Sequence, residues 1–218
     1  MKDLVVIIVI SYLLGSFPTG IIFGRLFRGI DIREHGSGNT GATNSFRVLG
    51  WKTGLAVALV DIFKGFTAGF WVAGISFFGG SLPEPVLFIA ATLSVVLGHI
   101  FPVFTGFRGG RGFGAAVGAV TAQAPLAAPF CLAVFFITLG FTGWVSVCAV
   151  TAAFTLPVAY VLISLIRGLP LDPIILVFFI LIFFLTFLGA RRKFFLYFQG
   201  GADVFEKVRI FRRKPYKK

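Results

Sequence analysis

Long apolar runs separated by short polar stretches dominate the pattern of this chain. The apolar blocks cover residues 4–23, 53–79, 85–104, 113–142, 144–166 and 171–190. Most of them approach the ~20 residues that a helix needs to cross a hydrocarbon core of roughly 30 Å. The pattern therefore predicts an all-α integral membrane protein in which the apolar blocks are transmembrane helices.

The block 113–142 is longer than one span requires, and two Ala-Pro pairs, at Pro125 and Pro129, interrupt it. Because a proline disfavours helix in the residue before it, we expect two helices here, at 113–123 and 128–142. The chain would then contain seven helices. The helix at 113–123 would rise only roughly 16 Å, so we expect it to be oblique or half-buried rather than a full span.

Composition supports a membrane protein, since 57% of the 218 residues are hydrophobic and only 13% are charged. A soluble domain is typically about 45–50% apolar. Cys131 and Cys148 lie inside apolar stretches and only two histidines occur, so we expect no metal site built from protein ligands.

The net charge of +12 is unevenly distributed, because residues 191–218 hold ten of the twenty basic side chains. Next to membrane spans, such a cluster marks the cytoplasmic side and anionic lipid heads rather than nucleic acid. The stretch 25–52 is basic too, and only an odd number of spans places both on one face. We therefore expect seven transmembrane helices, with the N-terminus outside and the C-terminus in the cytoplasm. Residues 1–190 would form a single polytopic membrane domain and residues 191–218 a basic cytoplasmic tail.

Residues 36–47 are a polar, glycine-rich stretch that reads Gly-Ser-Gly-Asn-Thr-Gly-Ala-Thr-Asn-Ser-Phe-Arg. Glycines let the backbone turn its N–H groups toward a ligand, and hydroxyl, amide and guanidinium groups bind phosphate. A polar turn that only caps helices accounts for the hydroxyls and amides equally well. The permanent cation of Arg47 favours anion binding. The candidate residues are Ser37, Gly38, Asn39, Thr43, Asn44 and Arg47.

A second glycine-rich stretch, residues 98–112, contains His99, Arg108, Gly109, Gly110 and Arg111. Its spacing does not fit a Walker loop, and an ordinary cytoplasmic turn with basic residues is the alternative. It leads into the helix expected at 113–123, and a helix N-terminus attracts anions. His99 has either a structural role or that of a proton carrier or hydrogen-bond donor to a substrate. Two such loops in an apolar chain indicate a phosphorylated substrate handled at a membrane face.

Asp61 and Lys64 are three residues apart in an apolar block, so on a helix they lie on one face. Charges inside membrane segments are costly and often functional. A local ion pair near the interface is nevertheless the simpler interpretation.

Residues 36–44 with Arg47, and residues 98–104 leading into 107–112, resemble two signatures of the bacterial membrane acyl-phosphate:glycerol-3-phosphate acyltransferase family. Smaller agreements occur at residues 15–20, 31–33 and 61–65. The resemblance implies a seven-helix enzyme with a cytoplasmic active site. Such an enzyme transfers an acyl chain from acyl phosphate to glycerol 3-phosphate among membrane lipids, giving lysophosphatidate and phosphate. It implies no cofactor, coenzyme A, acyl carrier protein or metal at this step.

The resemblance also assigns roles to residues. It implies that Ser37 and Arg47 hold substrate phosphate, and it places Arg111 and Arg108 where the family usually has lysines. We expect Ser37, Arg47, His99 and Arg111 to act in catalysis. The other residues named in the two loops would bind substrate phosphate.

A third signature of the family, His-Arg-x-Asn followed by Gly-x-Glu, is altered here. Arg191 stands for the histidine, Phe194 for the asparagine and Asp203 for the glutamate. The change leaves two alternatives open. One is a diverged paralogue that acylates another acceptor, and the other is a non-catalytic phospholipid-binding membrane protein.

Overall fold

A computed structural model describes residues 1–79 and 82–200, and this part of the chain is helical without any β-strand. The predicted all-α fold is confirmed. The α-helices are α1 (Lys2–Ser16), α2 (Thr19–Arg28), α3 (Ala42–Val48), α4 (Trp51–Phe70), α5 (Glu84–Ile100), α6 (Phe113–Gln123), α7 (Ala127–Thr142), α8 (Val145–Arg167) and α9 (Pro173–Phe198). Short 3-10 turns are η1 (Ile32–Glu34), η2 (Val72–Gly74) and η3 (Val103–Thr105).

Five helical segments within the described residues are long and apolar enough to cross a membrane. They are Lys2–Arg28, Trp51–Gly74, Glu84–Thr105, Val145–Arg167 and Pro173–Phe198. Helices α6 and α7 are apolar but shorter. The break predicted near Pro125 is present, since α6 ends at Gln123 and α7 begins at Ala127.

The first apolar block is not one continuous helix as its sequence suggests. Helix α1 ends at Ser16, and α2 starts at Thr19 after Phe17 and Pro18. Proline has no backbone N–H to continue the ladder and disfavours helix in the residue before it. The block 53–79 is likewise helical only in part, because α4 ends at Phe70.

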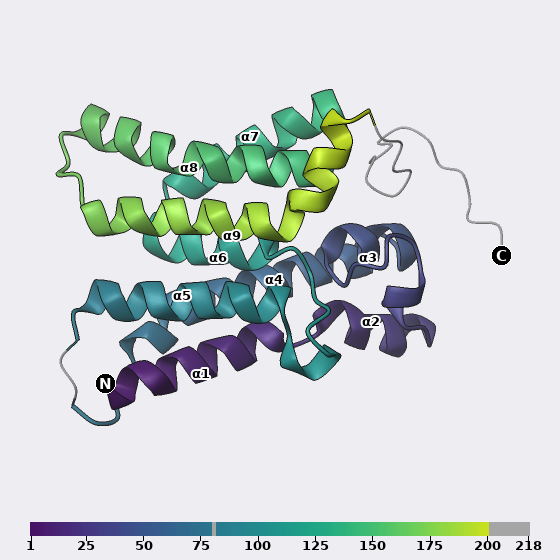
Figure 1. Cartoon of the computed structure of the whole chain (residues 1–218), viewed down its shortest axis with the longest axis horizontal. Coiled ribbons are helices and arrows are strands. Elements are labelled where there is room, and N and C mark those ends of the chain that lie inside the picture. The colour runs from purple at the N-terminus through teal and green to yellow at the C-terminus, as the bar shows by residue number, and fades with distance from the viewer. Residues whose placement is uncertain (80–81, 201–218) are drawn as a thin grey trace.

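Helix α9 continues past residue 190, where the last apolar block ends, and stops at Phe198. Its final residues, 194–198, include four aromatic side chains after the basic residues 191–193. In Figure 1 this last part, coloured yellow, turns away from the rest of α9. Residues 201–218, which include Asp203 and most of the predicted tail, lie outside the described residues.

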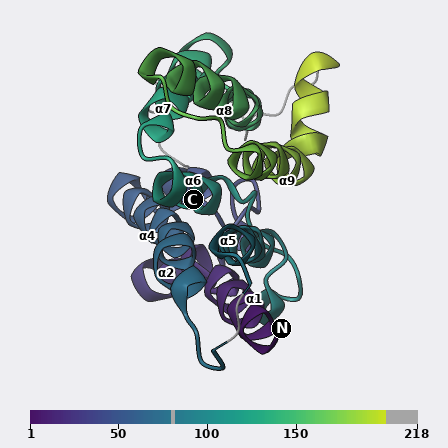
Figure 2. The same ribbon diagram turned by 90° about the vertical axis from the view of Figure 1, so that its left-hand side faces the viewer.

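The helices form two adjacent groups, with α7, α8 and α9 on one side and α1, α4 and α5 on the other (Figure 2). Small residues let neighbouring backbones approach closely, as in many membrane proteins. A side chain added at Gly65 would collide with the Ala115 carbonyl, and one at Gly118 with the Ile62 carbonyl. These contacts fix α6 against α4. Gly15 of α1 approaches Val95 of α5 in the same way.

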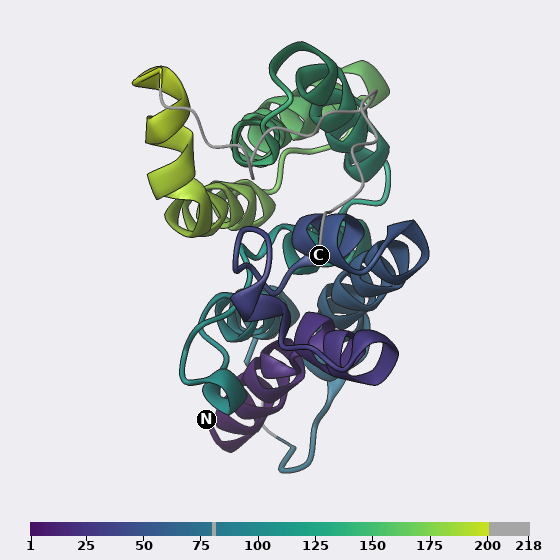
Figure 3. The ribbon, with the colours of Figure 1, turned by 90° about the vertical axis from the view of Figure 1, so that its right-hand side faces the viewer.

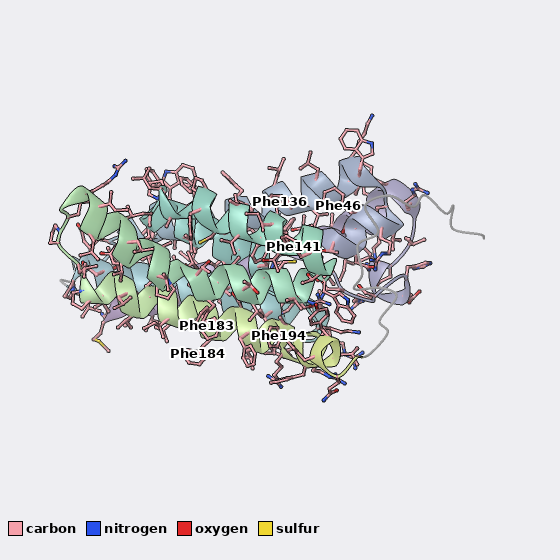
Figure 4. The ribbon with its side chains drawn as sticks, turned by 90° about the horizontal axis from the view of Figure 1, so that it is seen from above. Phe46, Phe136, Phe141, Phe183, Phe184 and Phe194 are labelled. Atoms are coloured by element: carbon pink, nitrogen blue, oxygen red, sulfur yellow. The ribbon has the colours of Figure 1, made fainter. Side chains whose placement is uncertain are left out.

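The outer surface is strongly apolar, as expected of helices that face lipid. Phe141 of α7 is 88% exposed, and Phe136 and Phe184 are also exposed. Figure 4 shows such phenylalanines along the helices. The core lies between α5, α6, α8 and α9 and includes Phe178 and Phe179. An apolar exterior around a packed interior is consistent with a multi-pass membrane protein.

Candidate active site

Both glycine-rich loops lie at the same end of the helices, which Figure 3 shows from that end. The first loop (residues 36–47) leads from η1 into α3, and the second loop (residues 98–112) leads from α5 into α6. The guanidinium of Arg33, just before the first loop, donates from Nη1 to the carbonyl of Thr105 at 3.5 Å. Helix α9 also ends on this side, whereas the chain starts at the opposite end (Figure 1).

Asn44 determines the shape of the first loop. Its buried Nδ2 donates to the carbonyls of Ile32, His35 and Asn39 at 3.2, 3.0 and 2.9 Å. Its Oδ1 accepts from the backbone N–H of Ser37 at 2.9 Å. The amide of Asn44, which the sequence suggested as a phosphate ligand, is therefore engaged by the loop's own backbone.

A glycine is required beside this amide. Gly36 has a φ of +61°, and a Cβ at that position would collide with Asn44 Oδ1. A residue with a side chain would meet both a strained backbone and a steric clash. The loop thus depends on the pairing of Gly36 with Asn44.

The remaining candidates of the first loop are more accessible. Asn39 Oδ1 accepts from the backbone N–H of Gly41 at 2.7 Å, which forms a side-chain turn. Gly38 is exposed, whereas Ser37, Thr43 and Arg47 are half-buried. Arg47 lies in the last turn of α3. These residues surround the loop surface that a ligand would contact.

Arg111 lies where α6, α8 and α9 converge. Its Nη1 donates to the hydroxyl of Ser146 in the first turn of α8 at 2.6 Å, and Ser146 is fully buried. Gly189 of α9 lies so close that a Cβ there would collide with the Arg111 carbonyl. The sequence alone does not indicate a role for Ser146. Its only sequence signal is a serine near the start of the apolar block 144–166.

His99 is buried at the end of α5 and packs against the second loop. A Cβ at Gly110 would collide with its ring, and the Gly110 N–H donates to the His99 carbonyl at 3.0 Å. Gly109 also lies against the His99 carbonyl, whereas Arg108 is exposed. His99 Nδ1 lies 3.6 Å from Asp61 Oδ1 of α4. The histidine is therefore held between the loop and a buried carboxylate.

A small cavity with polar side chains in its wall lies between the loops. Its lining includes Thr40 of the first loop, Thr105 of the second, and the buried groups of Asp61, Lys64 and His99. Residues far apart in the sequence thus meet around one space, which the spacing of motifs alone does not reveal.

Arg33 also pairs closely with Asp31. Its guanidinium nitrogens donate to both carboxylate oxygens, with Nη2 at 2.7 Å from Oδ2. These hydrogen bonds stabilise the ionised carboxylate and lower the pKa of Asp31 to about 2, although burial acts in the opposite direction. The pair therefore stays charged at neutral pH, with Arg33 held toward the second loop.

A second, narrow cavity is lined almost entirely by apolar side chains of α6, α7, α8 and α9. Phe113, which follows directly after Arg111 and Gly112, is part of its wall. One wall residue of this apolar cavity is therefore only two positions after Arg111 in the sequence. This arrangement suits a ligand with a charged head and a hydrocarbon tail.

Comparison with known proteins identifies the family. The family model described as glycerol-3-phosphate acyltransferase matches residues 5–199. The chain belongs to this family. A glycerol-3-phosphate acyltransferase of Chlorobium phaeobacteroides (strain DSM 266) is 45% identical over 164 residues, covering 72% of this chain and 69% of the relative.

Solved structures of a family member, PlsY (YgiH), are similar over most of the chain. Its glycerol 3-phosphate form is 34% identical, with a TM-score of 0.76, and covers 92% of this chain and 94% of that one. Its lysophosphatidic acid form is 33% identical, with a TM-score of 0.75 and the same coverage. These matches confirm the resemblance to integral membrane acyltransferases. They do not favour a non-catalytic binder or a paralogue for another acceptor.

The first part of the altered third signature, from Arg191 to Phe194, falls on the last turns of α9. Phe194, which stands where the resemblance expects an asparagine, packs against Phe187 and Phe198 with ring centroids 5.7 and 5.0 Å apart. Tyr197 contacts Trp144, just before α8, at 5.4 Å. An aromatic cluster therefore occupies the place where this family member differs from the expected pattern.

Proposed function

We propose that this protein transfers an acyl chain from acyl phosphate to glycerol 3-phosphate, giving lysophosphatidate and phosphate. Membership of the glycerol-3-phosphate acyltransferase family supports the acceptor. The observation that carries the proposal is the convergence of the two glycine-rich loops at one end of the helices, with Arg111 oriented by Ser146. The nearby apolar cavity supports a donor with a hydrocarbon tail.

Acyl phosphate is a mixed anhydride with a good leaving group, so positioning and charge neutralisation supply most of the catalysis. Arg47 and Arg111 neutralise the phosphates of the two substrates, and Ser37 binds one of them. The acceptor hydroxyl forms a bond to the acyl carbon while the bond from that carbon to the phosphate oxygen breaks. The departing phosphate takes the hydroxyl proton. Backbone N–H groups of the loops stabilise the negative charge that develops on the carbonyl oxygen.

The other loop residues assist in this scheme. Gly38 and Asn39 present backbone and amide groups at the accessible surface of the first loop, and Thr43 adds a hydroxyl. Arg108, Gly109 and Gly110 bring positive charge and closely approaching backbone to the phosphates. His99 holds the second loop, and Asn44 shapes the first loop from within. The last two residues therefore support the site through its geometry.

The same proposal includes a topology of seven spans, with the N-terminus outside and the active site at the cytoplasm. Five long apolar segments together with α6 and α7 provide the spans. The Arg111–Ser146 bond supports this count, because it places the start of α6 beside the start of α8. The chain then crosses the membrane twice between these two points, once in α6 and once in α7. Neighbouring helices bury much of the short α6, so this helix does not need to span the whole thickness of the bilayer by itself.

The experiment is an assay of the purified protein in lipid nanodiscs with palmitoyl phosphate as donor. We expect phosphate release and lysophosphatidate formation that both require added glycerol 3-phosphate. Glycerol and dihydroxyacetone phosphate serve as comparison acceptors, and palmitoyl coenzyme A as a comparison donor. Phosphate release that is independent of any acceptor, or equal use of all acceptors, would refute the proposal.

A further inference from the structure

A buried ion pair in α4 lies between the two loops. Asp61 and Lys64 are only 4% and 3% exposed, and Lys64 Nζ lies 2.8 Å from Asp61 Oδ1. Buried charges are costly unless they are paired and hydrogen-bonded. The sequence suggests a local pair, and the two residues do pair. Both side chains, however, also contact residues far away in the sequence.

Lys64 fixes the break between α1 and α2. Its ammonium donates to the carbonyls of Phe17 at 3.0 Å and Gly15 at 3.4 Å, at the C-terminal end of α1. Such carbonyls lack helical partners and attract a cation. On the other side of the break, the hydroxyl of Thr19 donates to Asp61 Oδ1 at 3.1 Å. The pair thus ties α4 to both sides of the break.

From this break, α2 reaches the first loop directly. Gly20, next to Thr19, approaches the Thr40 carbonyl so closely that an added Cβ would collide with it. A displacement of α2 would therefore be transmitted to the first loop through backbone contact. Interiors packed this tightly transmit small shifts rather than absorb them.

The same carboxylate reaches the second loop through His99. Asp61 Oδ1 lies 3.6 Å from His99 Nδ1, and the ring of His99 lies against Gly110. Gly110 also donates to the His99 carbonyl and directly precedes Arg111. One carboxylate therefore contacts the residues that support both loops.

Ser16 lines the cavity between the two loops, together with Asp61, Lys64 and His99. Its buried hydroxyl has no hydrogen-bond partner among the described residues.

We infer that Asp61 and Lys64 are positioning residues that set the distance between the first and second loops. The consequence for catalysis rests on the proposed function, because the loops would hold the phosphates of two different substrates. A misplacement of about 1 Å between reacting groups can reduce a rate by roughly 100-fold. Each loop would still bind its own phosphate, so the pair controls turnover more than affinity.

The test uses the double variant Asp61→Asn, Lys64→Met, which removes both charges and leaves no buried charge unpaired. We expect kcat to fall roughly 10- to 100-fold while KM for each substrate changes little. Lys52→Gln is the matched control, because it removes an exposed lysine from the same helix. It is expected to turn over like the wild type.

A distance measurement separates positioning from a general loss of structure. Spin labels at Glu34→Cys and Phe104→Cys, both exposed, report the separation of the loops when Cys131 and Cys148 are replaced by alanine. Pulsed dipolar spectroscopy is expected to give a narrow distribution in the wild type and the control. The double variant is expected to give a broader or shifted one.

If the double variant does not fold, Thr19→Val provides a second test, because it removes the hydrogen bond from Thr19 of α2 to Asp61 and leaves the Asp61–Lys64 ion pair intact. It is expected to change the distance distribution and lower kcat in the same direction. An unchanged distribution in a folded variant would overturn the inference, whether or not kcat falls. The distance requires no substrate, so it still decides the inference if the wild type proves inactive as an acyltransferase.

Discussion

Arg111 of the second loop donates a 2.6 Å hydrogen bond to the buried hydroxyl of Ser146 in the first turn of α8. The bond joins residues 35 positions apart and holds one guanidinium nitrogen in place. A guanidinium carries several N–H donors in a rigid fork, so one can be anchored while others face a ligand. Ser146 therefore orients the cation that we assign to a substrate phosphate.

Ser146→Ala is expected to reduce kcat/KM roughly 10- to 100-fold, because a hydrogen bond to a charged group contributes about 1.5–3 kcal/mol. Steady-state kinetics in nanodiscs measures the change. The control is Ser164→Ala, the same substitution in the last turn of the same helix. Equal activity of the Ser146 variant and wild type would show that the bond does not orient the arginine for catalysis.

Arg47→Ala and Arg111→Ala are each expected to lower turnover by at least about 100-fold, because each removes a cation that we propose stabilises phosphate charge. Both proteins should insert and purify, since neither arginine is fully buried. Lys52→Ala, at an exposed basic position, should remain active. Arg111→Lys should retain more activity than Arg111→Ala because it keeps the charge. Normal turnover of an alanine variant would contradict its assignment.

Much of the fold was predictable because membrane helices are long apolar runs, and Pro125 marked the division between α6 and α7. The break at Phe17 was not predicted. Pro18 is a local signal for it, but the apolar run continues past this proline to Phe23, and the Lys64 contact that stabilises the break is 47 residues away in the sequence. The continuation of α9 through Phe198 was not predicted, because the apolar block ends at residue 190 and the basic residues 191–193 follow it.

The site was predictable as two loops but not as an assembly. Glycines, hydroxyls and arginines in short stretches marked both loops, and the structure places them at one end. The sequence does not indicate that the Asn44 amide would bond to the loop itself, since an amide serves a ligand or a backbone equally well. Ser146 was missed because a single serine in an apolar block has no pattern.

Asn44→Asp is expected to disorganise the first loop, although it keeps nearly the same shape. An aspartate accepts the Ser37 N–H but has no N–H to donate to the three carbonyls that Asn44 Nδ2 contacts. Each buried group left without a partner costs about 1–3 kcal/mol. Hydrogen exchange across residues 32–41 should become faster, and activity should fall by at least tenfold. Asn39→Asp, which keeps its acceptor for Gly41, is the control and should retain slow exchange.

Asp31→Asn is expected to destabilise the protein in a way that depends on pH. Because the pKa of Asp31 is lowered to about 2 in the folded protein, its charge stabilises the fold fully above its unfolded pKa of about 3.9. That stabilisation is lost as the pH falls through about 2. Thermal unfolding in detergent should therefore show a constant difference between wild type and variant from pH 5 to 8. A difference that changes within this range would contradict the lowered pKa.

The apolar cavity between α6 and α9 yields a prediction about the donor. If it holds the acyl chain, Ala152→Leu should shorten the chain that the enzyme accepts, because Ala152 is a buried residue in the cavity wall. Turnover with stearoyl phosphate is expected to fall more steeply than turnover with lauroyl phosphate. Adding methylenes to a packed interior typically costs about 1–3 kcal/mol, so the ratio of the two rates is the informative quantity. Val158→Leu on the exposed side of α8 is the control and should leave that ratio unchanged. An equal loss of turnover with both donors would show that the acyl chain does not lie in this cavity.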